Sequence, residues 1–363
     1  MRRPVEPRTA LVTGATGQDG WYLVRRLLAE GWTVHAPVRD VERAERLFDH
    51  HPHLRALRRD LRDPGPLCAL VGDVRPEELY NLAGESSVGA SFADPCATWE
   101  SNAHVVVALL DAVRKDSPAT RVYQSSSGEM FGSAPGAGVV HDETSALNPQ
   151  SPYAAAKSAA HLLCRSYRES YDLRIACGIL FNHESHRRGA RFLTRKIVDH
   201  LQALRTGGER RPLALGNLMV QRDWGFAPNY VEAMVAILRQ ADVRGDPDEA
   251  RWYRDYVVGT GRLHHVWELA DRAFALAGFE LDWRLDGPDP LEWSAAFADT
   301  GGPAVVVDPA FLRPADPLAI LADPSRIVEE LGWQPTLGLD AFLEDMLLAV
   351  DQERQLGQHA EHE

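Results

Sequence analysis

The sequence predicts an α/β fold, a doubly wound parallel sheet followed by a smaller C-terminal mixed α/β domain. Two observations support this prediction. Apolar runs of strand length alternate with helical patterns from residue 8 to residue 181, and strands that alternate with helices form parallel sheets with right-handed crossovers. A glycine-rich turn also separates the first strand from the first helix, as in sheets of this class.

The alternation of strands and helices is regular through the first half of the chain. The first strand occupies residues 8–12, and an apolar helical pattern then runs through Tyr22 to Leu28. Further strands are predicted at residues 32–38, 56–61, 78–83, 121–126 and 175–181. The helices between them are predicted at residues 41–48, 64–71, 98–115 and 153–171. This order predicts one continuous sheet.

Beyond Phe181 the pattern loosens, which predicts a smaller mixed domain over the carboxyl edge of the sheet. Polar loops are expected at residues 207–211, 245–250 and 286–302. Residues 256–259 are expected to return to the main sheet as a late strand. The predicted domains are residues 1–181 with 222–262 for the main domain, 182–221 with 263–350 for the smaller one, and 351–363 for a polar tail.

Composition and charge exclude several classes of protein. At 363 residues, 45% hydrophobic and 25% charged, the chain has the composition of a globular protein rather than of a collagen or a disordered chain. No apolar run reaches the ~18 residues of a membrane span and no signal segment follows Met1, so we expect a cytoplasmic protein without a membrane partner. The net charge of −13 argues against a nucleic-acid partner. The four cysteines show no metal spacing and fit a reduced compartment. They are Cys68, Cys96, Cys164 and Cys177.

Gly14, Gly17 and Gly20 follow the first strand in the spacing G-x-x-G-x-x-G. The first glycine permits a tight turn, the second lets the backbone approach a pyrophosphate, and the third allows close packing of helix and strand. The context predicts a Rossmann-type dinucleotide site. The second strand ends in Arg39 and Asp40. An Arg there accepts the 2′-phosphate of NADP and an acid binds the ribose hydroxyl of NAD, so we favour NADP through Arg39, with NAD as the alternative.

Two pairs of residues predict proton transfer. Tyr153 and Lys157 lie four residues apart, and so on one face of a helix. A nearby ammonium lowers the pKa of a Tyr toward that of a usable base, and Lys157 is one of only three lysines among 39 basic residues. Ser127 and Glu129 follow the fifth strand at the carboxyl edge, where such sheets bind ligands. A serine-rich turn that caps a helix, in particular at Ser125, is the alternative for this segment.

A dense group of basic residues follows Phe181 in a chain whose net charge is negative. Guanidinium groups match phosphate oxygens, so the density predicts a clamp for phosphates, against the alternative of a solvated helix surface. Arg222 and Arg313 are predicted as later arms of this clamp. The cluster comprises Arg187, Arg188, Arg191, Arg195 and Lys196.

Together these residues resemble the GDP-mannose 4,6-dehydratases, an extended short-chain dehydrogenase/reductase family. The resemblance extends over most of the chain, and its most specific segments are GILFNHESHRRGARFLTRKI at residues 178–197 and LGNLMVQRDWG at residues 215–225. Other matching stretches are TGATGQDG at 13–20, YNLAGESSVGASF at 80–92, QSSSGEMFG at 124–132, SPYAAAKSAA at 151–160 and DPAFLRPADPLAILADPSRI at 308–327.

The resemblance implies a role for each matching residue. The catalytic group would be Ser127, Glu129, Tyr153 and Lys157. Cofactor contacts are implied for Tyr153 and Lys157 and for Gly14, Thr16, Gly17, Gln18, Asp19, Gly20, Arg39, Asp60, Leu61, Leu82, Ala83, Ser86, His183 and Arg188. Substrate contacts are implied for Ser87, Glu129, Asn182, Lys196, Arg222 and Arg313, and half of these residues lie in the smaller, substrate-binding domain.

The implied reaction converts GDP-mannose, or a related GDP-sugar, to the 4-keto-6-deoxy sugar nucleotide. Tyr153 would take the C4 hydroxyl proton while hydride leaves for the nicotinamide; Glu129 would remove the C5 proton, water would leave C6, and hydride would return there. An NDP-sugar 4-epimerase is the alternative, since it shares Tyr153 and Lys157 but needs no Glu for elimination. A catalytically dead sensor of the cofactor is disfavoured, because Tyr153, Lys157 and Glu129 are all present.

The chain departs from the family pattern at several site positions. Ser127 replaces Thr, Glu85 replaces Gln, Ala97 replaces Tyr, Asp40 replaces Arg and Asp316 replaces Glu. The segment 41–53 is shorter than the family loop that joins subunits, so we expect a homodimer, with a tetramer possible. The dimer is expected to form through the helices at residues 98–115 and 153–171 and to bury the side chains of Val105, Val106, Leu109 and Leu110.

Overall fold

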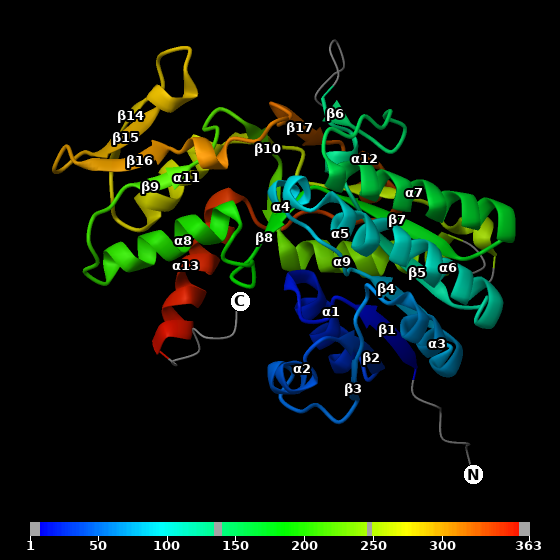
Figure 1. Ribbon diagram of the computed structural model, residues 1–363. Coiled ribbons are helices and arrows are strands. Elements are labelled where there is room, and N and C mark those ends of the chain that lie inside the picture. The colour runs from blue at the N-terminus through cyan, green and yellow to red at the C-terminus, as the bar shows by residue number, and fades with distance from the viewer. Residues whose placement is uncertain (1–7, 134–139, 245–248, 356–363) are drawn as a thin grey trace.

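A computed structural model describes residues 8–133, 140–244 and 249–355 (Figure 1). Its centre is a seven-stranded sheet in the order β12-β7-β5-β4-β1-β2-β3, and every pair of neighbours is parallel. The predicted doubly wound parallel sheet is therefore confirmed. Its strands are β1 (Thr9–Thr13), β2 (Thr33–Val38), β3 (Leu54–Arg58), β4 (Glu78–Asn81), β5 (Arg121–Ser127), β7 (Ile175–Leu180) and β12 (Tyr256–Val258).

Helices cover both faces of the sheet because its strands are apolar on both sides. One face packs against α3 (Pro64–Val74), α6 (Val105–Asp116) and α7 (Pro152–Tyr171). The other face packs against α1 (Gln18–Ala29), α2 (Val41–Leu47), α9 (Ala227–Leu238) and α12 (Ser325–Leu331). The chain order reverses between β1 and β4, which is the switch point where doubly wound sheets bind ligands.

The smaller part of the molecule lies beside the carboxyl edge of the sheet (Figure 1). A second sheet, in the order β14-β15-β16-β9, shares a core with three helices. Its strands are β9 (Leu213–Leu215), β14 (Leu281–Arg284), β15 (Ser294–Phe297) and β16 (Pro303–Val307), and the helices are α8 (Leu193–Arg205), α11 (Val266–Leu276) and α13 (Leu339–Gln355). Short strands connect the two parts: β6 (Val140–His141), β8 (Asn182–Glu184), β10 (Gln221–Arg222), β11 (Trp224–Phe226), β13 (His264–His265) and β17 (Ala319–Ala322).

Several predicted boundaries were wrong. The third strand occupies Leu54–Arg58 rather than residues 56–61, and the loop predicted at 286–302 contains β15, because its apolar residues complete the second sheet. Residues 351–355 of the predicted tail continue α13, where Asp351 accepts hydrogen bonds from Gln202 and Arg205. Residues 356–363 and part of the loop predicted at 245–250 lie outside the described residues. The late strand at 256–259 is confirmed, since β12 pairs with β7.

The helix predicted at 98–115 is subdivided, and its apolar face points inward. The helices α4 (Val88–Ala93) and α5 (Pro95–Trp99) precede a π-helical turn (Glu100–His104) that leads into α6. The side chains expected to be buried by a partner subunit are instead at most 2% exposed beneath α6, because they cover the sheet. These four residues are Val105, Val106, Leu109 and Leu110. The described residues contain no helix that combines the length and apolarity needed to cross a membrane.

Candidate active site

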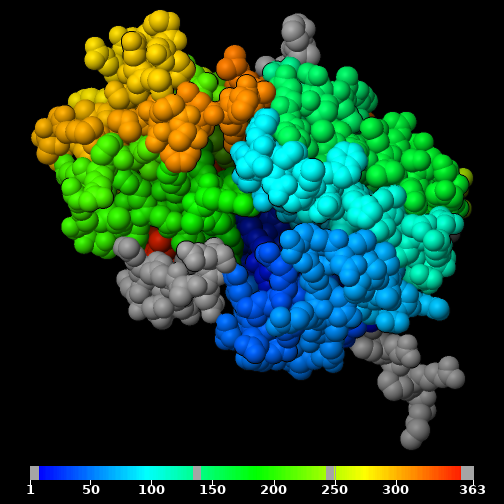
Figure 2. Space-filling view, viewed as in Figure 1, coloured from blue at the N-terminus to red at the C-terminus, as the bar shows by residue number. Residues whose placement is uncertain are grey.

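A cavity of about 1400 Å³ separates the two parts of the molecule along the carboxyl edge of the main sheet. Figure 2 shows it as a cleft between the blue N-terminal segments and the green and orange segments of the smaller part. Residues from both parts line it, including Gly14, Tyr153, Lys196 and Arg313. The lining includes Arg39, which follows β2 in the main sheet, and Arg313, which lies in the smaller part.

The glycine loop forms one wall of this cavity and has the geometry that the spacing predicts. Gly14 has φ +70°, and a Cβ there would lie 2.9 Å from the backbone nitrogen of Ala83 at the end of β4. The amide of Gly17 donates to the Gly14 carbonyl at 2.9 Å, which closes the turn. A Cβ on Gly20 would lie 2.1 Å from the Gly14 oxygen. The chain therefore packs α1 against β1 more closely than a side chain would permit.

We expect Gly20→Ala to destabilise the fold and weaken nucleotide binding. The added methyl would push the Gly14 carbonyl out of the turn, and overpacking of this kind costs about 1–3 kcal/mol. The measurements are urea unfolding and retention of bound nucleotide after gel filtration. Gly338→Ala is the control, because a Cβ at Gly338 would meet no atom within 4 Å. Unchanged stability and retention in Gly20→Ala would contradict the packing role.

Positive charge gathers where β2 and β3 end. Arg39 lines the cavity, whereas the carboxylate of Asp40 accepts a hydrogen bond from the Arg43 amide at 2.9 Å and caps α2. Sequence reasoning missed Arg43 and Arg59, which also line this end, although Arg59 comes directly after the third strand, at the edge where ligands bind. Asp60 and Leu61 line the same end. Hydrogen bonds from Arg62 lower the pKa of Asp60 to about 2.

Asp19 and His183 lie at the cavity wall but are engaged with each other. The Nε2 atom of His183 lies 2.9 Å from Asp19 Oδ2, and Gln18 donates to the His183 carbonyl at 3.0 Å. Burial would raise the pKa of Asp19, yet the charge of His183 lowers it below its ordinary value. Burial in turn would lower the pKa of His183, but Asp19 raises it. The pair joins α1 to β8, and its contact with a cofactor stays a prediction.

Tyr153 and Lys157 come together on α7, as their spacing predicts. Ser151 caps the helix by accepting the Ala154 amide at 3.1 Å, and Lys157 Nζ donates to the Ser125 carbonyl at 3.0 Å. The Lys157 ammonium also lies 5.8 Å from the centre of the Tyr153 ring. The hydrogen bond from Lys157 to β5 thus fixes the position of this side chain, next to Tyr153, at the carboxyl end of the strand.

The predicted lowering of the Tyr153 pKa by Lys157 is wrong for this structure. Burial raises the pKa of Tyr153 to about 12, although a hydrogen bond with Ser127 opposes that rise. Burial also lowers the pKa of Lys157 to about 8. Desolvation outweighs the interaction between the two groups, because the ammonium is directed to the Ser125 carbonyl. Tyr153 therefore needs further positive charge beside it before it can act as a base near neutral pH.

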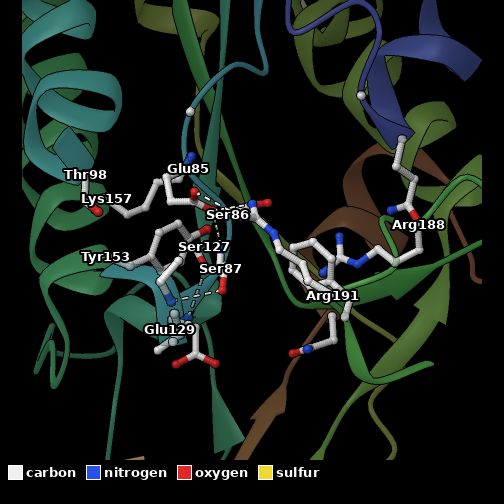
Figure 3. Close-up of a pocket in the computed structure, with 18 of the residues that line it drawn as sticks. Glu85, Ser86, Ser87, Thr98, Ser127, Glu129, Tyr153, Lys157, Arg188 and Arg191 are labelled. Carbon is white, nitrogen blue, oxygen red and sulfur yellow. Dashed lines mark hydrogen bonds and ion pairs between the residues drawn. The ribbon is translucent and has the colours of Figure 1, made fainter. Parts of the chain in front are cut away.

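Glu129 stands beside Tyr153 at the end of β5 (Figure 3). Its amide donates to Ser127 Oγ at 3.3 Å, so Ser127 caps the short helical turn as the alternative interpretation allowed. The Glu129 side chain is 15% exposed, and one carboxylate oxygen lies 3.7 Å from Arg222 Nε. Its charge acts on Tyr153 and raises the pKa of that phenol. The two predicted proton-transfer groups therefore share one site.

Arg222 is a buried structural cation rather than a free arm of a clamp. Its guanidinium donates to Asp316 at 2.6 Å and to the carbonyls of Gln221 and Pro317. Arg313 meets the same Asp316 carboxylate at 3.2 Å. Both arginines line the cavity, but Asp316 neutralises part of their charge. Arg222 also lies 3.7 Å from the Glu129 carboxylate, and its contact with a phosphate stays a prediction.

The predicted basic cluster divides into two groups. Arg188, Arg191 and Lys196 line the cavity, with the Lys196 ammonium 3.4 Å from the centre of the Phe311 ring. Arg195 is buried against Asp199 at 2.7 Å, and Arg187 packs over the Trp21 ring instead of lining the cavity. The helix α8 has to bury one face in the smaller core, and this requirement removes Arg195 from the clamp.

The remaining predicted site residues also line the cavity. Ser87 does so while its hydroxyl accepts the Ala90 amide at 3.1 Å and caps α4, so this hydroxyl already has a structural partner. Phe311, which sequence reasoning missed, covers the wall beside Lys196. The other predicted residues that line the cavity are Thr16, Leu82, Ala83, Ser86 and Asn182.

Comparison with known proteins places this geometry among enzymes of nucleotide sugars. The family model described as GDP-mannose 4,6 dehydratase matches residues 11–346. GDP-mannose 4,6 dehydratase 2 of Arabidopsis thaliana is 40% identical over 97% of this chain and 88% of its own length. A dTDP-glucose 4,6-dehydratase structure from Streptomyces venezuelae with NAD bound superimposes with a TM-score of 0.75 at 23% identity, covering 96% of this chain and 98% of that one. RMD from Pseudomonas aeruginosa, complexed with NADPH, gives a TM-score of 0.73 at 22% identity, covering 95% and 99%.

Proposed function

The chain belongs to the GDP-mannose 4,6-dehydratase family, and from this premise we propose that it is a nucleotide-sugar 4,6-dehydratase acting on GDP-mannose or a related GDP-sugar. The single observation that carries the proposal is the placement of Glu129 beside Tyr153 in one cavity. A 4-epimerase needs the Tyr base alone, whereas elimination of water across C5 and C6 needs a second group to remove the C5 proton. Glu129 is suitably placed to provide it.

The cavity fits a nicotinamide dinucleotide at its sheet edge. The cradle at Gly14, where a Cβ would collide with the backbone of the loop after β4, leaves room for a pyrophosphate at the N-terminus of α1. Lys157 and Tyr153 lie at the other end of that edge. When bound, the oxidised nicotinamide would supply a positive charge and an acceptor for the C4 hydride, and the reduced form so produced would supply the hydride that returns to C6.

Each remaining step is assigned to a side chain of this protein. Tyr153 takes the proton of the C4 hydroxyl as C4 is oxidised to a ketone. The ketone acidifies the C5 hydrogen, and Glu129 removes that proton. Glu129, assisted by Ser127, passes this proton to the C6 hydroxyl, which leaves as water. Solvent then reprotonates Glu129, which returns a proton to C5, while Tyr153 releases the C4 hydroxyl proton to solvent. Lys196, which lines the same cavity, would hold the phosphates of the sugar nucleotide, and Arg188 would contact the cofactor.

We propose NADP as the cofactor. Arg39, Arg43 and Arg59 form a cationic end of the cavity, and Asp40 is occupied in capping α2. Arg39→Ala should therefore weaken NADP binding by about tenfold to a hundredfold, the effect of losing a charged hydrogen bond, and leave NAD binding unchanged. Titrations of both cofactors with the stripped protein measure this difference. Arg58→Ala, an exposed arginine outside the cavity, is the control. Equal affinity of the wild type for NAD and NADP would contradict the assignment.

The proposed function is tested by incubating the purified protein with a panel of nucleotide sugars and no added reductant. We expect a GDP-hexose to yield a product lighter by one water. A product of unchanged mass would indicate an epimerase, and a requirement for stoichiometric NADPH would indicate a simple reductase. Either result would overturn the dehydratase.

We also propose a homodimer through α5 and α7. Trp99, Leu162 and Tyr171 are about half exposed on these helices, with exposed fractions of 51%, 52% and 50%. These three side chains provide an exposed apolar surface for a partner subunit, whereas the apolar side chains of α6 are buried against the sheet. Light scattering at micromolar concentration measures the mass, and a monomer would contradict the proposal.

A further inference from the structure

An ion pair crosses the cavity close to Tyr153. Arg191 Nη2 lies 2.5 Å from Glu85 Oε1, and Arg191 Nη1 lies 3.3 Å from Glu85 Oε2. The carboxylate also accepts the Ser87 amide at 2.7 Å, which fixes it on the loop after β4. Figure 3 shows Glu85 beside Ser86, Ser127 and Tyr153, with the Arg191 guanidinium meeting it from the opposite wall.

The two partners come from opposite sides of the site. Glu85 belongs to the loop that follows β4 in the main sheet, and Arg191 precedes α8 in the smaller part. Their side chains are 26% and 55% exposed, and ion pairs with that exposure contribute little to stability. Yet both line the cavity and close a bidentate contact across it. We therefore expect the pair to affect the reaction in the cavity rather than the stability of the fold.

Charged and polar groups surround the Tyr153 phenol on every element packed against it. Ser127 from β5 hydrogen-bonds it and Lys157 from α7 lies near its ring. The charge of Arg188, in the loop after β8, lowers the pKa of the phenol, although this guanidinium is itself paired with Glu184 at 3.2 Å. Two carboxylates oppose these cations, Glu129 after β5 and Glu85 after β4. Each carboxylate has a nearby guanidinium: Arg222 lies 3.7 Å from Glu129, and Arg191 forms an ion pair with Glu85.

We propose that Glu85 and Arg191 form a charge-balancing pair for the first step of the reaction, in which Arg191 holds the Glu85 carboxylate and reduces the negative charge that it presents to Tyr153. Arg191 is thus a positioning residue that acts through Glu85. This inference rests on the proposed function only for the role of Tyr153 as the base at C4. That step is shared by a dehydratase and a 4-epimerase, so it can be measured even if product analysis excludes dehydration.

The test follows the pH dependence of single-turnover C4 oxidation, recorded as reduction of the bound nicotinamide and as substrate consumed. The acidic limb of this profile reports ionisation of Tyr153. Glu85→Gln removes a negative charge that opposes this ionisation, so the limb should move to lower pH by about 1 unit. Arg191→Gln leaves the Glu85 charge unbalanced and should move the limb to higher pH. In the double variant Glu85→Gln/Arg191→Gln the limb should match that of Glu85→Gln alone, because without the carboxylate Arg191 has nothing to balance.

Arg272→Gln is the matched control, since it breaks a partly exposed ion pair with Asp340 in the smaller part. It should leave the profile unchanged, and urea unfolding should show similar stability for all variants. The proposal is overturned if Glu85→Gln does not move the limb, or if Arg191→Gln moves it equally with and without Glu85. A wild type that oxidises C4 but releases no water would refute the dehydratase and leave this test intact. A wild type that oxidises no sugar nucleotide would refute both.

Discussion

Glu129→Gln is expected to stop dehydration while the first oxidation continues. The amide is nearly isosteric with the carboxylate, so the cavity keeps its shape, but it cannot take the C5 proton. Loss of a general acid–base group lowers a rate by about 10²–10⁴-fold. The absorbance of reduced nicotinamide should therefore build up on mixing with substrate, and exchange of deuterium at C5 with solvent should cease.

The outcome discriminates between two roles for this residue. Glu129 also lies 3.7 Å from Arg222 and belongs to a turn that Ser127 caps. If its role were purely structural, Glu129→Gln would lower the stability of the fold but leave the ratio of C4 oxidation to water elimination unchanged. Glu280→Gln, an exposed carboxylate before β14, controls for loss of one negative charge. Full dehydration by Glu129→Gln would show that Ser127 or a water molecule carries the proton.

Tyr153→Phe is expected to abolish both half-reactions. The phenol is buried and hydrogen-bonded to Ser127, and no other hydroxyl on α7 occupies that position beside Lys157 in the part of the chain that the structure describes. C4 oxidation should fall by about 10²–10⁴-fold, and neither reduced nicotinamide nor product should form. The measurement is the same mixing experiment as for Glu129→Gln.

Binding provides the check on Tyr153→Phe. The ring remains, so affinity for the nucleotide of the substrate should change little, as calorimetric titration would show. Tyr171→Phe is the control, because that Tyr lies half exposed at the far end of the same helix. Appearance of reduced nicotinamide in Tyr153→Phe at the wild-type rate would exclude Tyr153 as the base.

The local geometry that follows from residue spacing was predicted well. Gly14 and Gly20 need close backbone packing, and Tyr153 and Lys157 share a helical face by periodicity alone. Residues whose roles depend on a distant partner were predicted less well. Arg195 and Arg222 read as clamp residues, but Asp199 and Asp316 engage them.

The sequence by itself determined the parallel sheet, the glycine cradle and the helical face that Tyr153 and Lys157 share, because strand and helix periodicities and short motifs act within a few residues. Only the tertiary structure decided the charge balance of the site. It directs Lys157 to the Ser125 carbonyl, pairs Asp19 with His183, and closes Glu85 against Arg191, which lies 106 positions further along the chain. Such pairings depend on burial and on which loops meet at the sheet edge, and desolvation rather than sequence spacing then sets the pKa of Tyr153.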